Sequence, residues 1–369
     1  MIHYLVTRDE NRGITRYLAG RGKPLAGFLR ILYLDDLHRF PSFPCGTFIF
    51  SNLDHLSPFQ RDVAGQVARS LFRSGPGLKI LNHPDRVLLR YELLCRLHAL
   101  GINRFRAVRA SESLDSLNYP VFLRAENHHL GALTNLLPDR ASLERAIREK
   151  MILGYRRSEL LAVELCDTSD GSGLFRKYSA FKIGNRIVPR YVNISSHWVV
   201  KFEAWSPEIA GEVLDYLENN PHESLLREIF DIAGADYGRI DYGMQDGRPQ
   251  VWEINLNPLF GRGRLKSESG AAGKTDIMNR LEEAKNIIHV RLLEAFRELD
   301  DPDGSEREAV LDIPRKTLRT LKISLGKQTQ SQFRAFMNMK RKPWSYVRRS
   351  LDGAAAAIVK AEALLKCRR

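Results

Sequence analysis

The segment 237–258 constrains the fold of this chain more than any other, because it reads as two strands joined by a tight turn. Runs of strand-forming residues flank Asp246-Gly247, a dipeptide typical of β-hairpin turns. Side chains alternate between the two faces of a strand, so each strand carries polar groups at every second position. One face of the pair can therefore gather four polar side chains: Arg239, Asp241, Glu253 and Asn255.

The register of the pairing decides whether these four side chains meet. A two-residue turn would place the charged Asp241 beside the apolar Trp252, which is unfavourable. A three-residue loop at 245–247, with Gly247 in the left-handed conformation, keeps the apolar side chains together instead. We therefore predict the three-residue loop, with an apolar face made of Ile240, Tyr242, Trp252 and Ile254.

The polar face of this hairpin predicts a metal site. Asp241 and Glu253 supply carboxylates, and Asn255 supplies an amide oxygen. These are hard oxygen donors, which suit Mg²⁺ better than zinc or copper. The spacing leaves one alternative open, an exposed hairpin whose polar face is simply solvated.

The pattern along the rest of the chain predicts an α+β protein. A length of 369 residues suggests roughly two domains at about 150 residues each. Residues 1–83 alternate short apolar runs with polar stretches, so we expect a small α/β domain with strands at 2–6, 29–34, 46–50 and 78–81 and a helix at 57–73. Residues 84–300 lack regular βαβ alternation. There we expect helices at 84–100, 141–150, 207–219, 222–233 and 275–299, strands at 119–124 and 160–166, a ribbon at 174–192, and a linker beginning at residue 301.

The positive charge is confined to the C-terminal segment. The net charge is +13, yet residues 314–369 hold fifteen Lys and Arg against Asp352 and Glu362, and residues 1–313 are neutral. The high pI therefore does not indicate a nucleic-acid-binding fold. A basic tail with a helical stretch at 354–365 suits contact with an anionic membrane surface. RNA is a less favoured partner, and a helix pair packed on the body is a further alternative.

The cysteines and the N-terminus indicate the compartment. The four cysteines, at positions 45, 95, 166 and 367, form no Cys-x-x-Cys pair, which fits reduced thiols. The first residues read as a strand rather than a leader, and no run of eighteen apolar residues occurs. We expect a cytoplasmic protein, with a peripheral place at the inner face of a membrane as the alternative.

One resemblance adds to this reading. The run Arg239-Ile-Asp-Tyr, followed twelve residues after its aspartate by Glu253-Ile-Asn-Leu-Asn-Pro, resembles the metal-binding hairpin of the ATP-grasp superfamily, which includes glutathione synthetase and the ribosomal glutamate-adding ligases. The order of elements over residues 80–260 agrees. The resemblance implies an ATP-grasp domain at 84–300, an N-terminal pre-ATP-grasp domain at 1–83 and a basic helical tail at 314–369. It also implies ATP and Mg²⁺ as cofactors, with the metal on Asp241, Glu253 and Asn255.

The resemblance also assigns nucleotide contacts. Two family lysines that reach the phosphates correspond to Arg90 and Arg124, and arginine keeps the charge while changing the reach. Glu164 lies in the segment that resembles the hinge strand, and Arg239 completes the set. The loop after Arg124 is poorer in glycine than the usual lid, and His128 and His129 could close over the γ-phosphate instead.

The activity implied is that of an ATP-dependent carboxylate-amine, or carboxylate-thiol, ligase. A small-molecule or peptide carboxylate would attack the γ-phosphorus to give an acylphosphate, and an amine would then displace phosphate. Arg176 and Arg190 match the basic positions that would stabilise the anionic oxygens. Two alternatives stay open: a kinase that phosphorylates a hydroxyl, and a non-catalytic anion- or membrane-binding protein with a vestigial ATP site.

Overall fold

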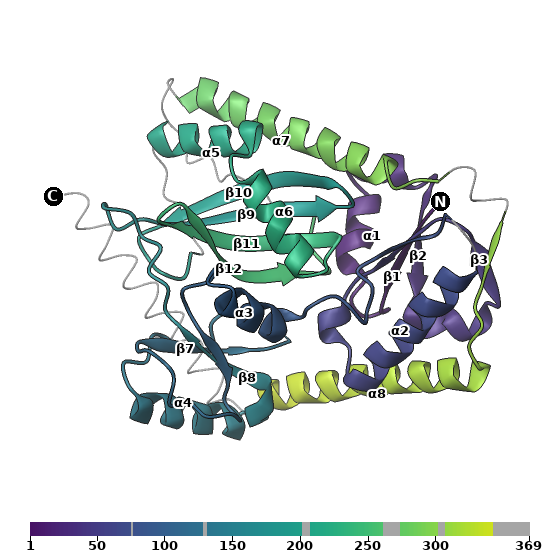
Figure 1. Ribbon diagram of the computed structural model, residues 1–369, viewed down its shortest axis with the longest axis horizontal. Coiled ribbons are helices and arrows are strands. Elements are labelled where there is room, and N and C mark those ends of the chain that lie inside the picture. Colours follow the sequence, from purple (N-terminus) through teal and green to yellow (C-terminus); the bar gives the residue numbers. More distant parts are fainter. Residues whose placement is uncertain (75–76, 128–130, 201–206, 261–273, 302–306, 342–369) are drawn as a thin grey trace. The chain divides into compact units, whose positions relative to one another are not determined.

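The computed structural model describes residues 1–369 except 75–76, 128–130, 201–206, 261–273, 302–306 and 342–369 (Figure 1). The predicted helix at 354–365, His128, His129 and most of the linker after residue 301 therefore lie outside the described residues. Contacts divide the chain into two units, Met1–Leu321 and Lys322–Arg369. The boundary predicted between residues 83 and 84 falls inside the first unit and stays a prediction.

The N-terminal region is a parallel sheet with the strand order β2-β1-β4-β5. Its strands are β1 (Ile2–Val6), β2 (Leu29–Tyr33), β4 (Thr47–Phe50) and β5 (Lys79–Leu81). Helix α1 (Arg12–Leu18) follows β1, and α2 (Pro58–Arg73) joins β4 to β5. Helix α2 begins at Ser57, whose hydroxyl accepts from the Gln60 backbone while the Gln60 side chain accepts from the Ser57 backbone, a capping box. The predicted strands and the predicted helix of this region are confirmed.

A second, three-stranded sheet has the order β6-β8-β7. Its strands are β6 (Ala107–Arg109), β7 (Val121–Ala125) and β8 (Leu160–Glu164), and α4 (Arg140–Ile152) packs on β7. Helix α3 (Arg90–Ala99) is shorter than the predicted helix at 84–100, because residues 84–86 form a turn and residues 87–89 have no regular secondary structure, with Leu89 as the N-cap. Arg90 is thereby the first residue of its helix.

The third sheet is antiparallel, with the order β10-β9-β11-β12. Its strands are β9 (Phe175–Ile183), β10 (Arg186–Ser195), β11 (Tyr237–Gln245) and β12 (Arg248–Asn255). Helix α5 (Pro207–Asn219) contacts β10, and α6 (Glu223–Ile232) also packs there, so both cover one face of this sheet (Figure 1). Helix α7 (Lys274–Arg297) contacts α5, β10 and β9.

The remaining elements are short or lie at the C-terminal side. Strand β3 (Ser42–Pro44) pairs antiparallel with β13 (Glu308–Val310), a pairing that the sequence pattern did not predict because each strand is only three residues long. Helix α8 spans Arg315–Arg341. Short 3-10 helices occupy Lys23–Leu25, Leu34–Arg39, Leu53–His55 and Arg157–Glu159. None of the described helices is long and apolar enough to cross a bilayer, and the three cysteines described are free thiols, as predicted.

The hairpin of β11 and β12 differs from the predicted one in its turn. Gln245 pairs with Arg248, which leaves a two-residue turn. Both turn residues have positive φ, 49° at Asp246 and 74° at Gly247, as a type I′ turn requires. The predicted three-residue loop is therefore wrong.

A β-bulge at Trp252 nevertheless produces the predicted grouping of polar side chains. Tyr242 pairs with Val251, whereas the adjacent Asp241 pairs with Glu253, so Trp252 is left outside the ladder. One extra residue exchanges the two faces of a strand, which returns Glu253 to the face of Asp241. Trp252 does not lie on the apolar face as predicted; it packs against the cluster between α3, β6 and β8. The α+β class is confirmed.

Candidate functional site

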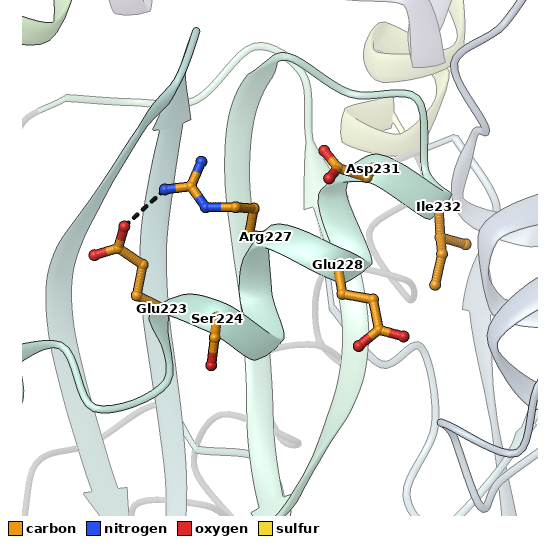
Figure 2. Close-up of a pocket in the computed structure, with 6 residues that line it drawn as sticks. All are labelled: Glu223, Ser224, Arg227, Glu228, Asp231 and Ile232. Carbon is orange, nitrogen blue, oxygen red and sulfur yellow. Dashed lines mark hydrogen bonds and ion pairs between the residues drawn. The ribbon is translucent and has the colours of Figure 1, made fainter.

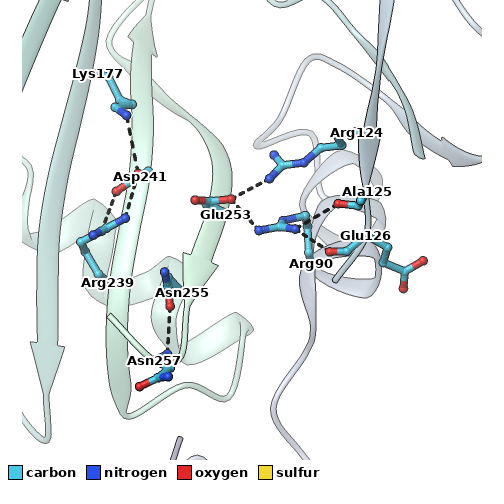
Figure 3. Close-up of polar contacts among 10 residues, drawn as sticks. All are labelled: Arg90, Arg124, Ala125, Glu126, Lys177, Arg239, Asp241, Glu253, Asn255 and Asn257. Atoms are coloured by element: carbon cyan, nitrogen blue, oxygen red, sulfur yellow. Dashed lines mark hydrogen bonds and ion pairs between the residues drawn. The ribbon is translucent and has the colours of Figure 1, made fainter. Parts of the chain in front are cut away.

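The bulged hairpin carries the predicted metal ligands on one face of its sheet (Figure 3). Asp241 lies directly opposite Glu253, and Arg239 lies directly opposite Asn255. On the neighbouring strand β9, Ser179 lies opposite Asp241. Asp241 and Asn255 are buried, with 5% and 7% of their surface exposed. Asp241 and Asn255 are therefore not on a solvated surface, which was the alternative reading of this hairpin.

Asp241 is held by groups from two strands. Its Oδ1 atom accepts hydrogen bonds from Ser179 Oγ at 2.9 Å and from Arg239 Nε at 3.0 Å. Lys177 Nζ lies 3.9 Å from Asp241 Oδ2. Burial would lower the pKa of Arg239, but the adjacent Asp241 carboxylate raises it overall. The aspartate is thus fixed among cationic groups.

Glu253 links the hairpin to helix α3 and strand β7. Its Oε2 atom accepts from Arg90 Nη2 at 2.6 Å and from Arg124 Nη2 at 2.7 Å. Arg90 stands at the start of α3 and also donates to the carbonyl oxygens of Ala125 and Glu126, at 3.3 and 2.5 Å. Arg124 comes from β7. One carboxylate oxygen therefore gathers two arginines from different elements, as Figure 3 shows.

Cationic groups outnumber the two carboxylates on this face. The basic side chains that adjoin them are Arg90, Arg124, Lys177, Arg190 and Arg239. Burial, followed by the charge of Arg90, lowers the pKa of Arg124 to about 10. Burial, followed by the charge of Arg239, lowers the pKa of Arg190 to about 10. Arginine normally stays charged in proteins, so several positive charges lie close together in a buried position at this site.

Arg190 reaches this face through an irregularity of its own strand. The register between β10 and β9 shifts between Pro189 and Tyr191, so Arg190 lies at a bulge. Its guanidinium carbon lies 5.3 Å from the ring centre of Phe181 and 4.9 Å from that of Tyr191. These cation–π contacts hold the side chain over the face that carries Asp241.

Arg176 is not brought into the site. It alternates with Lys177 along β9 and so points to the opposite face, where α5 lies. There its Nε donates to Glu212 at 2.6 Å and its Nη1 donates to Asp170 at 2.6 Å. The one-residue alternation of the strand separates Arg176 from Asp241, so the structure does not bring these two predicted site residues together.

Glu164 has a structural role in the described fold. Its two carboxylate oxygens accept from the backbone N–H groups of Arg106 at 2.8 Å and Asn118 at 2.6 Å. These bonds fix the segments that flank β8. The contact of this carboxylate with a nucleotide stays a prediction.

Asn255 links the site to the N-terminal sheet. Its Oδ1 accepts from the backbone N–H of Asn257 at 2.9 Å. Asn257 in turn accepts from Tyr4 Oη at 3.2 Å and donates to the carbonyl of Glu10 at 2.9 Å. The end of the hairpin is therefore positioned by residues that follow or belong to β1.

Several site residues were missed or given little weight by sequence reasoning. Ser179 and Lys177 lie on the face of Asp241, and strand alternation in the ribbon could have identified them once its pairing with β11 was known. Arg109 binds both oxygens of Glu126, at 2.8 and 2.7 Å, next to the carbonyl that receives Arg90. No pattern in the sequence indicated this pair, because β6 is only three residues long.

A hollow elsewhere on the surface is distinct from this site. It lies along α6, where Arg227 pairs with Glu223 at 2.7 Å (Figure 2). The opposite side of α6 packs Leu226 and Phe230 into the core, on the face of the sheet away from Asp241.

Among the residues that the structure describes, no group of three or more His, Cys, Asp or Glu is placed to hold a metal ion. The hairpin site offers two carboxylates and one amide.

Comparisons with known proteins give likenesses of structure alone. No family model matches the sequence, and no curated protein gives a significant match. The RimK domain protein ATP-grasp from Sphaerobacter thermophilus is 13% identical, with a TM-score of 0.40 over 78% of this chain and 98% of that one. The D-alanine–D-alanine ligase of Bacillus anthracis complexed with ATP is 13% identical, with a TM-score of 0.42 over 79% and 98%.

A third likeness is to the L-amino acid ligase of Bacillus licheniformis, 13% identical, with a TM-score of 0.37 over 69% of this chain and 66% of that one. These values describe a similarity of structure between this chain and the three proteins. The function proposed below rests on the geometry of the hairpin site and not on these likenesses.

Proposed function

We propose that the hairpin face binds ATP with Mg²⁺ and that the chain is an ATP-dependent carboxylate-amine ligase of the ATP-grasp type. The observation that carries this proposal is the composition of the buried face. Asp241 and Glu253 stand side by side, and burial together with a neighbouring arginine lowers the pKa of Arg124 and of Arg190, so positive charges crowd together beside the carboxylates. A ligand that brings several negative charges, such as a triphosphate, compensates that charge.

The donor set of the face fits a magnesium ion. Two carboxylates and an amide oxygen are hard donors, and Mg²⁺ in nucleotide sites is commonly held by one or two carboxylates plus phosphate oxygens. Both arginine contacts of Glu253 converge on its Oε2 atom. Asp241, Glu253 and Asn255 would hold the ion, which supplies charge neutralisation between ATP and an anionic acceptor.

The surrounding side chains have separate tasks in this proposal. Arg124, from the end of β7, and Arg90, from the start of α3, bind phosphate oxygens, since arginine matches phosphate geometry with paired N–H groups. Arg239 orients Asp241, to which it donates at 3.0 Å. Arg190, held by its ring contacts, stabilises negative charge on the transferred group. Removal of one such charge-assisted contact typically costs about 1.5 to 3 kcal/mol.

A ligase reaction needs no nucleophile from the chain. The acceptor carboxylate attacks the γ-phosphorus of ATP and releases ADP, and the resulting acylphosphate is attacked by an amine, or less often a thiol, with release of phosphate. The chain's contribution is to align the reactants and stabilise the developing charge. The substrates we propose are a small-molecule or peptide carboxylate and an amine. The free thiols of Cys45, Cys95 and Cys166 agree with the cytoplasm as the proposed compartment.

The test is a nucleotide-binding and turnover assay on the whole chain. ATP binding would be measured by calorimetry with and without Mg²⁺, and phosphate release with pools of amino acids, peptides and sugar acids. We expect Asp241→Asn and Glu253→Gln to abolish turnover, while Glu212→Gln on the opposite face of the sheet retains it. Full activity in both site variants would contradict the proposal.

The identity of the products separates the ligase from the other predicted functions. Mass spectrometry of an active pool should show an amide together with free phosphate and ADP. A stable phosphorylated hydroxyl would identify a kinase. Tight ATP binding without turnover in any pool would indicate a vestigial site.

A further inference from the structure

Helix α4 ends in three consecutive aliphatic side chains that are exposed. Met151, Ile152 and Leu153 expose 45%, 78% and 46% of their surface. The buried side of the same helix is formed by Leu143, Ala146 and Ile147, so the helix has its own core contacts and the terminal residues are additional apolar surface. Clustered apolar exposure of this kind marks a contact surface more often than isolated exposed residues do.

The turn that presents these side chains is fixed by hydrogen bonds. Gly154 has φ of 99° and donates its N–H to the carbonyl of Met151 at 2.9 Å. Tyr155 donates its N–H to the carbonyl of Lys150 at 3.2 Å and packs against the core under α4. These two bonds define a Schellman motif, in which glycine supplies the left-handed residue. The exposure of Ile152 is therefore built into the end of the helix.

Basic residues surround this tip. Residues 145–157 contain five Arg or Lys and one acidic residue, Glu149; two of the five, Arg156 and Arg157, pair with Glu159 and Glu144 just outside this range. Arg145 and Arg148 are exposed and stand seven and four positions before Ile152, so they share its helix face. A basic helix face therefore leads directly into the apolar end.

We propose that the tip of α4, defined as Met151, Ile152 and Leu153 with Arg145 and Arg148, inserts shallowly into the surface of an anionic lipid bilayer. Aliphatic side chains at the end of a basic helix face combine the two forces of interfacial binding, apolar burial and attraction to anionic headgroups. A second copy of this chain is a poorer occupant, because a symmetric contact would bring the same basic residues together. This inference is independent of the proposed function.

The experiment measures binding of the full chain to vesicles by flotation. The probes are vesicles of phosphatidylcholine and vesicles of two parts phosphatidylcholine to one part phosphatidylglycerol. We expect binding to the anionic vesicles, lowered about tenfold by Ile152→Ser and about tenfold by Arg145→Gln with Arg148→Gln. Val290→Ser, at a residue of α7 that is 50% exposed, is the matched control and should bind like wild type. Unchanged melting temperatures would show that the variants fold.

Three results would overturn the proposal. Wild type that does not bind the anionic vesicles would exclude the bilayer. Equal binding by wild type and Ile152→Ser would assign the lipid contact to the basic C-terminal segment instead. Self-association of wild type in gel filtration that Ile152→Ser abolishes, with no effect on flotation, would identify a second copy of the chain as the occupant.

Discussion

The two faces of the β10-β9-β11-β12 sheet carry the same types of charged residue but balance them in opposite ways. On the face covered by α5 and α6, two cations meet four carboxylates: Arg176 contacts Glu212 and Asp170, and Lys182 contacts Asp231 and Asp236. On the hairpin face, two carboxylates stand among five basic side chains.

The difference is also seen in the arginines themselves. The hydrogen bond that Arg176 donates to Glu212 raises the pKa of Arg176, whereas burial and a neighbouring arginine lower the pKa of Arg124. Compensated ion pairs of the first kind serve the fold. Crowded buried cations destabilise the free protein and become favourable when an anion binds, which is what the proposed ligand site requires.

The largest effect should come from moving Glu253 to the other face of the sheet. Deletion of Trp252 alone removes the bulge but keeps Asp241 opposite Glu253, because Tyr242 already pairs with Val251. Deletion of Val251 together with Trp252 would instead place Glu253 opposite Tyr242, on the other face. We expect turnover to fall at least about a thousandfold in the double deletion, whereas the single deletion should retain most of the activity of the folded protein. Equal losses in the two variants would show that the indole matters and the face of Glu253 does not.

The bulge at Trp252 is also an example of a feature that the sequence alone did not predict. Most of the longer elements followed from apolar periodicity, and the strands of the N-terminal sheet were predicted within a residue or two, but α1 and the three-residue strands β3, β6 and β13 were not predicted. The grouping of Asp241 with Glu253 was predicted correctly, but from an incorrect loop. The pattern of apolar residues requires one extra residue somewhere in the hairpin, and it does not show whether that residue lies in the turn or in a bulge. The same role was predicted for Arg176 and Arg190, although they lie on different faces of the sheet. The face of Arg190 depends on a second bulge, between Pro189 and Tyr191 in β10, which no local sequence pattern reveals.

The next effect concerns stability. Glu253→Gln would leave Arg90 and Arg124 without the carboxylate that they share, and breaking a buried ion pair costs about 3 kcal/mol or more. The matched change Glu212→Gln lies on the balanced face, is about one-third exposed (31%), and should cost about 1 kcal/mol. Urea unfolding of both variants would measure the difference. Equal losses would remove the distinction between the two faces.

A third comparison separates effects on stability from effects on ATP binding. Arg124→Met removes one of two adjacent buried cations, so we expect a small change in the free energy of unfolding but ATP binding about 10- to 100-fold weaker. Arg176→Met removes the partner of Glu212 and Asp170, so we expect about 1 kcal/mol of destabilisation and unchanged ATP binding. Calorimetry with ATP and Mg²⁺, together with urea unfolding, would measure all four quantities. Weaker ATP binding in Arg176→Met would show that Arg176 contributes to nucleotide binding although it faces α5.

The smallest effect is a difference in pH dependence between two histidines. On the helix-covered side, His222 Nδ1 lies 2.9 Å from Tyr242 Oη, and burial lowers the pKa of His222 below its usual 6.5. Near Arg90, burial would lower the pKa of His55, but the hydrogen bond to Glu10 and the charge of Asp54 raise it overall.

The two shifts have opposite signs in the free energy of unfolding. The contribution of His222 is complete above pH 6.5 and is lost as the pH falls toward its lowered pKa, because the unfolded chain takes up the proton first. The contribution of His55 is complete below pH 6.5 and is lost as the pH rises through its raised pKa. Relative to wild type, His222→Asn should therefore lose less stability on acidification, and His55→Asn should lose less on passing to mildly alkaline pH. Urea unfolding across this range would check both slopes, and slopes of the same sign would show that the two sides do not differ in this respect.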